Sequence, residues 1–176
     1  MTFRSILIII VLGFTTSLFA DTNSVKEADL KAAYIYNFAR YTNWANKAAK
    51  SGQFIICVHK ESDLYMSLKK LENKKIKGMR IKVLILDEGK DSLVPCHIVV
   101  LPKLNDRRLR SLVKKAVKSH VLSISDTNGY AQKGVTINLK KVSNKMTFEV
   151  NLDQVKRTKL KMSSNLLKLA TIVSKK

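Results

Sequence analysis

The sequence predicts an α/β fold: a single compact domain in which a mixed β-sheet is flanked by helices. Segments with the alternation of a strand follow segments with the period of a helix along the chain, which favours a helix-covered sheet. Near the C-terminus, two alternating segments flank the turn pair Ser143-Asn144, and Ser163 or Ser164 can cap a helix after them. The fold is therefore expected to end in an antiparallel hairpin and a closing helix.

The first 20 residues have the pattern of a secretory signal peptide. Arg4 precedes the apolar run Ile6–Leu12, and a mixed stretch ends in Ala20, a small residue suited to cleavage. The run is too short and too interrupted for a convincing membrane span, although an uncleaved N-terminal anchor is the alternative. We expect cleavage after about Ala20, which leaves one exported domain over residues 21–176.

The first helix of this domain is expected to run from a capping box at Ser24–Glu27 to about Trp44. It carries two neighbouring apolar stripes, whereas a surface helix needs only one. The second stripe is therefore either buried deep in the fold or available to another protein, since Tyr and Trp are enriched at interfaces. The first stripe is Tyr34, Phe38 and Tyr41, and the second is Ala32, Ile35, Tyr36 and Ala39.

The middle of the chain alternates predicted strands and helices. Strands are expected at residues 53–58, 80–86, 97–101 and 120–125, and helices at residues 61–71 and after the N-cap Asn105. In the C-terminal hairpin, alternation places Met146, Phe148 and Val150 toward the core and Thr147, Glu149 and Asn151 on the opposite face. The last helix is expected to bury Leu166, Leu169, Ala170 and Val173 on one face.

The chain is strongly basic, with a formal net charge of +20. Such a charge attracts anionic surfaces, and an envelope or polyanion binder is one hypothesis. However, 26 of the 33 cationic residues are lysines scattered along the chain, and phosphate recognition favours arginine. A solvated lysine-rich surface is the favoured interpretation, and nucleic acid is not expected as a partner.

Two cysteines, Cys57 and Cys96, lie at the ends of predicted strands in an exported chain. A disulfide between them is favoured and would close a loop of about 40 residues. Two buried free thiols are one alternative. Another is a zinc site with His59 and His97, although neither spacing matches a known zinc module.

Signatures of catalysis are missing from the sequence. It contains no G-x-S-x-G, H-E-x-x-H, G-x-x-x-x-G-K or G-x-G-x-x-G motif. His120 and Ser123 are close in sequence, but alternation along a strand puts them on opposite faces. We therefore expect a non-enzymatic protein without metal or other cofactor.

Three blocks of sequence resemble the YfiR-like family of periplasmic proteins. The first runs from Lys31 to Phe38 (KAAYIYNF) with Tyr41 and Trp44, and the second contains Cys96 and the segment 121–126 (VLSISD). The third and most specific is Gly134 to Ala170, with FEVNL at 148–152 and SSNLLKLA at 163–170. Together they span nearly the whole exported domain.

The resemblance implies a regulator that acts by binding. Family members are periplasmic inhibitors of an inner-membrane diguanylate cyclase, form dimers and can be sequestered by an outer-membrane peptidoglycan-binding lipoprotein. It also implies that the spacing of Cys57 and Cys96 is that of a structural disulfide, and it places Glu149 on the partner surface. A second disulfide of some members has no counterpart here.

The sequence, with this resemblance, thus predicts a periplasmic regulator that binds the sensor domain of an inner-membrane signalling protein, expected to be a diguanylate cyclase, and represses cyclic-di-GMP synthesis. The alternatives are a periplasmic small-molecule binding protein and the charge-driven binder described above. The expected partner-binding residues are Tyr36, Asn37, Tyr41, Trp44 and Glu149.

Overall fold

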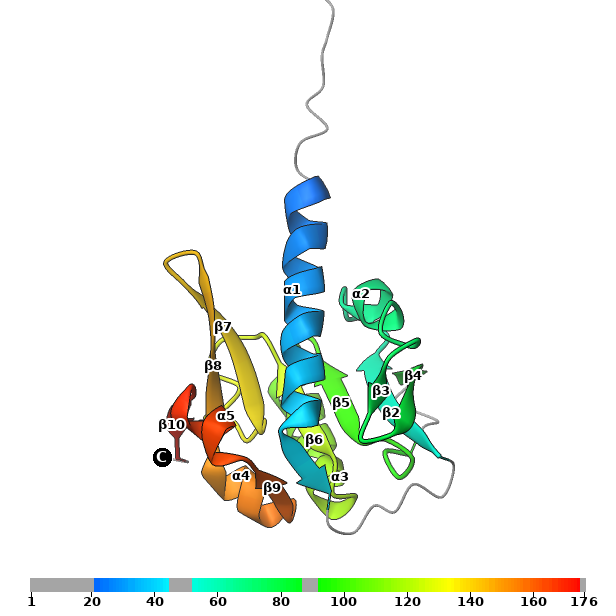
Figure 1. Ribbon diagram of the computed structural model, residues 1–176. Coiled ribbons are helices and arrows are strands. Elements are labelled where there is room, and N and C mark those ends of the chain that lie inside the picture. The colour runs from blue at the N-terminus through cyan, green and yellow to red at the C-terminus, as the bar shows by residue number, and fades with distance from the viewer. Residues whose placement is uncertain (1–20, 45–51, 87–91, 175–176) are drawn as a thin grey trace, which may run out of the picture.

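The computed structural model describes residues 21–44, 52–86 and 92–174, and its centre is an eight-stranded mixed sheet (Figure 1). The predicted signal peptide at residues 1–20 lies outside the described residues. The sheet confirms the α/β class with helices on both faces. In sheet order the strands are β10 (Thr171–Val173), β8 (Lys145–Asn151), β7 (Ile137–Val142), β6 (Leu122–Ser125), β5 (Ile98–Leu101), β2 (Gln53–His59), β4 (Met79–Leu86) and β3 (Lys75–Ile76).

Within the sheet, the five strands β4, β2, β5, β6 and β7 are parallel to one another. Strands of this kind are covered on both faces and read as continuous apolar runs. Accordingly, every residue of β5 and every residue of β2 after Gln53 is buried. The chain goes from β2 to β4 on one side and then returns to β5 on the other, so the strand order reverses between β2 and β5.

Helices on the two faces of the sheet cover two separate hydrophobic cores. Helix α1 (Asp21–Arg40) and the short α2 (Tyr65–Lys69) lie over one face, and α3 (Asp106–Lys118) covers the other. The predicted N-cap of α3 is confirmed, because the Asn105 side chain accepts a hydrogen bond from the Arg108 backbone N–H. The predicted helix at residues 61–71 is confirmed only in its central part, and turns flank it.

The C-terminal hairpin forms as expected, with β7 and β8 antiparallel. Ser143 and Asn144 both have positive φ angles, 44° and 64°, which is the backbone of a two-residue hairpin turn of type I′. Phe148 and Val150 lie in the core beneath α1. Glu149 and Asn151 face the opposite way, but they are buried there as well.

Both ends of the first helix differ from the prediction. Helix α1 begins at Asp21, so Ser24 lies inside it and the predicted capping box does not start it. It ends at Arg40, and β1 (Thr42–Trp44) pairs with β9 (Leu160–Met162) instead of continuing the helix. The reason is tertiary: Tyr41 O accepts a hydrogen bond from Ser163 N, and Lys77 Nζ donates to Thr42 O at 2.6 Å.

The C-terminal segment also differs from a single closing helix. Ser163 caps α5 (Ser164–Lys168) as predicted, and Leu166 is buried, but the helix then ends. Residues 171–173 form β10, parallel to β8, and the side chain of Leu169 is 76% exposed. A further helix, α4 (Leu152–Arg157), follows β8 directly and is capped by Asn151.

Cys57 and Cys96 form a disulfide, as predicted, with their Cα atoms 5.7 Å apart. It joins β2 to the turn that precedes β5, and both residues are buried in the core beneath α3. The sulfur atoms are therefore not available as metal ligands. Among the described residues, no group of three or more His, Cys, Asp or Glu side chains is arranged to hold a metal ion.

Candidate functional site

The predicted partner residues Tyr36, Asn37 and Tyr41 lie where α1 meets solvent. Asn37 is exposed on the last turns of the helix, and the Tyr41 side chain just after it is 43% exposed. Leu30 lies two turns earlier on the same outward side and is 46% exposed. Because Ala32, Ile35, Phe38 and Ala39 fill the core side, α1 has one buried face and one largely open face.

Tyr36 sits at the border between these two faces. Its hydroxyl donates to Lys75 O at 3.3 Å, which ties α1 to β3. The Arg40 guanidinium and the Lys74 ammonium lie 5.9 Å and 5.2 Å from the centre of its ring. Cations at this distance are attracted by the face of an aromatic ring. Tyr36 thus presents a cation-flanked ring at the edge of the exposed face.

Trp44 points inward and has a packing role. Its indole N–H donates to His97 O at 3.0 Å, and its ring meets the Phe54 ring edge-on at 5.1 Å. This contact fixes β1 against the start of β5, 53 residues away along the chain. Any effect of Trp44 on a partner would therefore pass through the position of β1.

Glu149 lies on the other side of the sheet from α1, so the structure does not bring it together with the residues of the helix. Its side chain is only 7% exposed, and its Oε1 accepts from Lys140 Nζ at 3.0 Å. Its cross-strand neighbour Asn138 is fully buried, and Glu149 Oε2 has no hydrogen-bond partner among the described residues. Lys140, at 37% exposure, is the accessible member of the pair.

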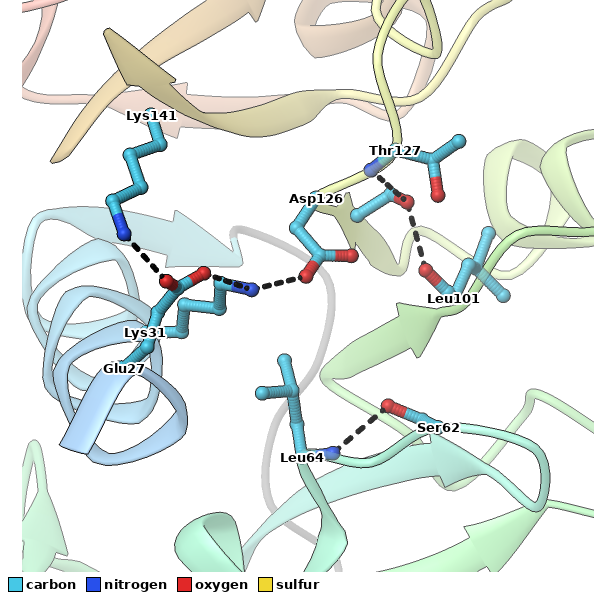
Figure 2. A network of polar contacts seen from close by, with 9 residues as sticks. Glu27, Lys31, Ser62, Leu64, Leu101, Asp126, Thr127 and Lys141 are labelled. Atoms are coloured by element: carbon cyan, nitrogen blue, oxygen red, sulfur yellow. Dashed lines mark hydrogen bonds and ion pairs between the residues drawn. The ribbon is translucent and has the colours of Figure 1, made fainter. Parts of the chain in front are cut away.

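A polar bridge that the sequence did not indicate connects α1 to two parts of the sheet. Lys31 Nζ lies 2.9 Å from Glu27 on the previous turn and 2.7 Å from Asp126, which follows β6 (Figure 2). Glu27 also binds Lys141 of β7 at 2.9 Å. The Lys31 side chain is 14% exposed, so this bridge is partly shielded from solvent. We call Glu27, Lys31, Asp126 and Lys141 the α1 bridge.

The ends of the strands below the bridge are also fixed by hydrogen bonds. Ser125 Oγ donates to Leu101 O at 2.8 Å and accepts from Thr127 N, so β5 and β6 end together (Figure 2). In open α/β sheets, this carboxyl edge is where binding sites usually form. Here Asp126, just after β6, holds the inner side of α1 through Lys31.

The charges of the bridge stabilise one another. Burial opposes the charge on Lys31 and is the largest single effect, but its hydrogen bonds to Asp126 and Glu27 together raise the pKa of Lys31. Hydrogen bonds from Lys141 and then Lys31 lower the pKa of Glu27 from 4.5 to about 2. The Glu27 contribution to stability is therefore present above pH 4.5 and is lost as pH falls from 4.5 toward 2.

We expect Glu27→Gln to lower the urea midpoint at pH 7 and to flatten its dependence on pH between 4.5 and 2. Glutamine removes the charge that Lys31 and Lys141 stabilise, so protonation can no longer weaken the bridge at that position. Unfolding followed by circular dichroism at pH 7 and pH 3 measures both effects. Glu61→Gln is the matched control, since Glu61 is exposed and its carboxylate contacts Arg108 at the longer distances of 3.3 and 3.4 Å. An equal flattening in both variants would contradict the assignment.

Comparison with known protein families shows to which family this chain belongs. Residues 28–171 match the model of the YfiR/HmsC-like family. The match covers all the elements described above except the first residues of α1 and the end of β10. The chain belongs to the YfiR/HmsC-like family. The resemblance seen in the sequence is therefore confirmed. The family is periplasmic, regulatory and non-enzymatic, and membership supports a regulator of diguanylate cyclase in general.

Solved structures with the same fold include the ligand-free, open form of CD0873, a substrate-binding protein with adhesive properties from Clostridium difficile. The TM-score is 0.55 at 16% sequence identity, and the match covers 84% of this YfiR-like chain and 59% of that chain. At this identity the likeness concerns the fold alone. A search of curated proteins finds no match.

No helix in the described parts of this YfiR-like chain is long and apolar enough to cross a membrane.

Proposed function

We propose that this YfiR-like protein is a periplasmic, non-enzymatic regulator that binds the periplasmic sensor domain of an inner-membrane diguanylate cyclase and represses cyclic-di-GMP synthesis. Membership of the YfiR/HmsC-like family over residues 28–171 carries the proposal. The chain would reach the periplasm through the signal peptide, with cleavage after about Ala20. It would act as a homodimer, and an outer-membrane peptidoglycan-binding lipoprotein would compete for it.

The exposed face of α1 is the partner surface that we propose. Leu30 and Tyr41 are large apolar side chains nearly half exposed, and Asn37 and Tyr36 add polar and aromatic contacts between them. Interfaces favour such a mixture of an apolar patch with Tyr. Trp44 supports this surface from inside through β1, whereas Glu149, which binds Lys140, lies on the opposite face of the sheet and is not part of it.

Repression would follow from differential affinity. A regulator that binds the inactive arrangement of the sensor domain more tightly than the active one shifts the equilibrium toward inactivity. Removal of the regulator by the lipoprotein would lower its free concentration and reverse the shift. Neither step needs chemistry, which agrees with the absence of catalytic motifs from the sequence.

The test is capture from the native membrane with the tagged full-length protein, followed by mass spectrometry. We expect wild type to retain a diguanylate cyclase and Asn37→Arg to lose most of it, because a long cation enters the centre of the proposed contact. Cyclic-di-GMP in cells should rise with the same variant. Asn128→Arg is the matched control, since Asn128 is exposed in the turn after β6 and not on α1.

Two outcomes would contradict the proposal. Wild type that retains no membrane signalling protein would refute the function, and equal retention by Asn37→Arg and Asn128→Arg would refute the surface. Capture should also persist at moderate salt, whereas binding by general charge attraction would collapse there. Glu149→Arg is not a suitable probe of contact, because it would place a cation at a buried position and weaken the fold.

A further inference from the structure

A groove of about 470 Å³ runs along α3, on the face of the sheet opposite α1. One wall is α3 itself, and the other is formed by residues 132–134 and by Gln154 and Arg157 of α4. The volume is within the range of small-molecule sites, about 300–1,000 Å³. Leu109, Val113 and Val117 supply an apolar base.

Gly134 allows the second wall to approach the helix this closely. Its φ is +101°, in the region that favours glycine, and a Cβ there would come within 3.2 Å of Val113 Cγ1. The same Cβ would lie 3.3 Å from Gln154 Nε2. Gln154 is 4% exposed, and its Oε1 has no hydrogen-bond partner among the described residues. The wall of the groove thus includes one buried amide oxygen that accepts no hydrogen bond from the described residues.

The rim of the groove carries a concentrated positive charge. Four cationic side chains line it, and the single carboxylate, Asp106, already binds Lys133 at 2.7 Å. Lys114 and Arg157 make no ion pair with any described residue. Arg110 and Lys114 are four residues apart on one side of α3, where like charges repel and destabilise a helix. An anion in the groove would relieve this repulsion.

We propose that the α3 groove binds a small organic anion, with its acidic group held by Arg110, Lys114 and Arg157 and its apolar part against Leu109 and Val113. The guanidinium groups suit a carboxylate or a phosphate, since each can donate two parallel hydrogen bonds to either. The site lies on the opposite face from the proposed partner surface. It therefore goes beyond the proposed function and can be tested independently of it.

Titration of the ¹⁵N-labelled full chain with phenyl phosphate and with phenylacetate, at 150 mM salt, tests the proposal by NMR. We expect saturable shifts confined to amides near residues 106–117, 132–134 and 154–157. Either anion binding in this way supports the site, and the tighter one identifies its acidic group. Benzyl alcohol, a neutral analogue, should bind at least about tenfold more weakly, since hydrogen bonds to charged groups are the stronger kind.

Matched variants on α3 distinguish binding in the groove from non-specific attraction to the positively charged surface. Arg110→Gln should weaken binding about tenfold, whereas Arg107→Gln should leave it unchanged, because Arg107 is exposed on the same helix but does not line the groove. Lys114→Gln and Lys115→Gln form a second pair of the same kind. Equal losses within each pair, shifts spread over the whole surface, or equal affinity for the neutral analogue would overturn the proposal. The absence of saturable binding by both anions would overturn it as well.

Discussion

Phe38→Ala should lower the free energy of unfolding by about 3–5 kcal/mol, the usual cost of removing a buried phenylalanine. Phe38 is 1% exposed and belongs to a cluster of three aromatic rings with Tyr34 and Phe148. Its ring centre is 4.8 Å from that of Phe148 and 6.0 Å from that of Tyr34. The substitution would therefore leave a cavity where α1 packs on the hairpin.

Urea unfolding monitored by circular dichroism gives the stability change directly. Phe38→Leu is the control, since it keeps most of the apolar volume and should cost clearly less than the alanine variant. Hydrogen exchange should show the greatest loss of protection in α1 and in β7–β8, where the contact is made. A cost below about 1 kcal/mol for Phe38→Ala would mean that α1 does not depend on this aromatic cluster.

The centre of the fold could be predicted from the sequence because its signals are local. The buried parallel strands are continuous apolar runs, α3 has an Asn105 cap before an amphipathic stretch, and Ser143-Asn144 marks the hairpin turn. Each of these features depends on residues next to one another in the chain. The same is true of the Ser163 cap, although not of the length of the helix that follows it.

The short strands β1, β9 and β10 could not be predicted in this way. Each has three residues and exists because a distant segment supplies its hydrogen-bond partners. The aromatic spacing of α1 continues through Tyr41 and Trp44, so local periodicity extends the helix, while the pairing of Thr42 with Met162 ends it. Tertiary contacts override local preference at such positions.

In the candidate site, too, contacts between residues far apart in the chain could not be predicted from the sequence. Tyr36, Asn37 and Tyr41 could be nominated from local sequence because they lie in or directly after one helix, but the α1 bridge joins residues up to 114 positions apart. In a chain with 33 cationic residues, one lysine and one aspartate give no signal of their pairing. Alternation gave the face of Glu149 correctly, but it could not reveal that this face is covered.

Loss of the Cys57–Cys96 disulfide should destabilise the protein by about 3–4 kcal/mol, as expected for a bridge that closes a loop of this length. The two cysteines are 39 positions apart, and the loop between them contains α2, β3 and β4. Without the bridge, the unfolded chain regains the freedom of this loop, while the native contacts of β2 and β5 remain. For a domain of this size, the melting temperature should fall by about 10 °C.

Thermal unfolding of the Cys57→Ala, Cys96→Ala double variant, compared with wild type with and without reductant, measures the effect. Because the two cysteines are 3% and 0% exposed, dithiothreitol should reduce the native protein slowly and the urea-unfolded protein quickly. The double variant should keep the native circular dichroism spectrum at 20 °C, since its sheet pairing does not need the sulfur atoms. A melting temperature equal to that of wild type, or two free thiols in non-reducing mass spectrometry, would show that the bridge does not stabilise the fold.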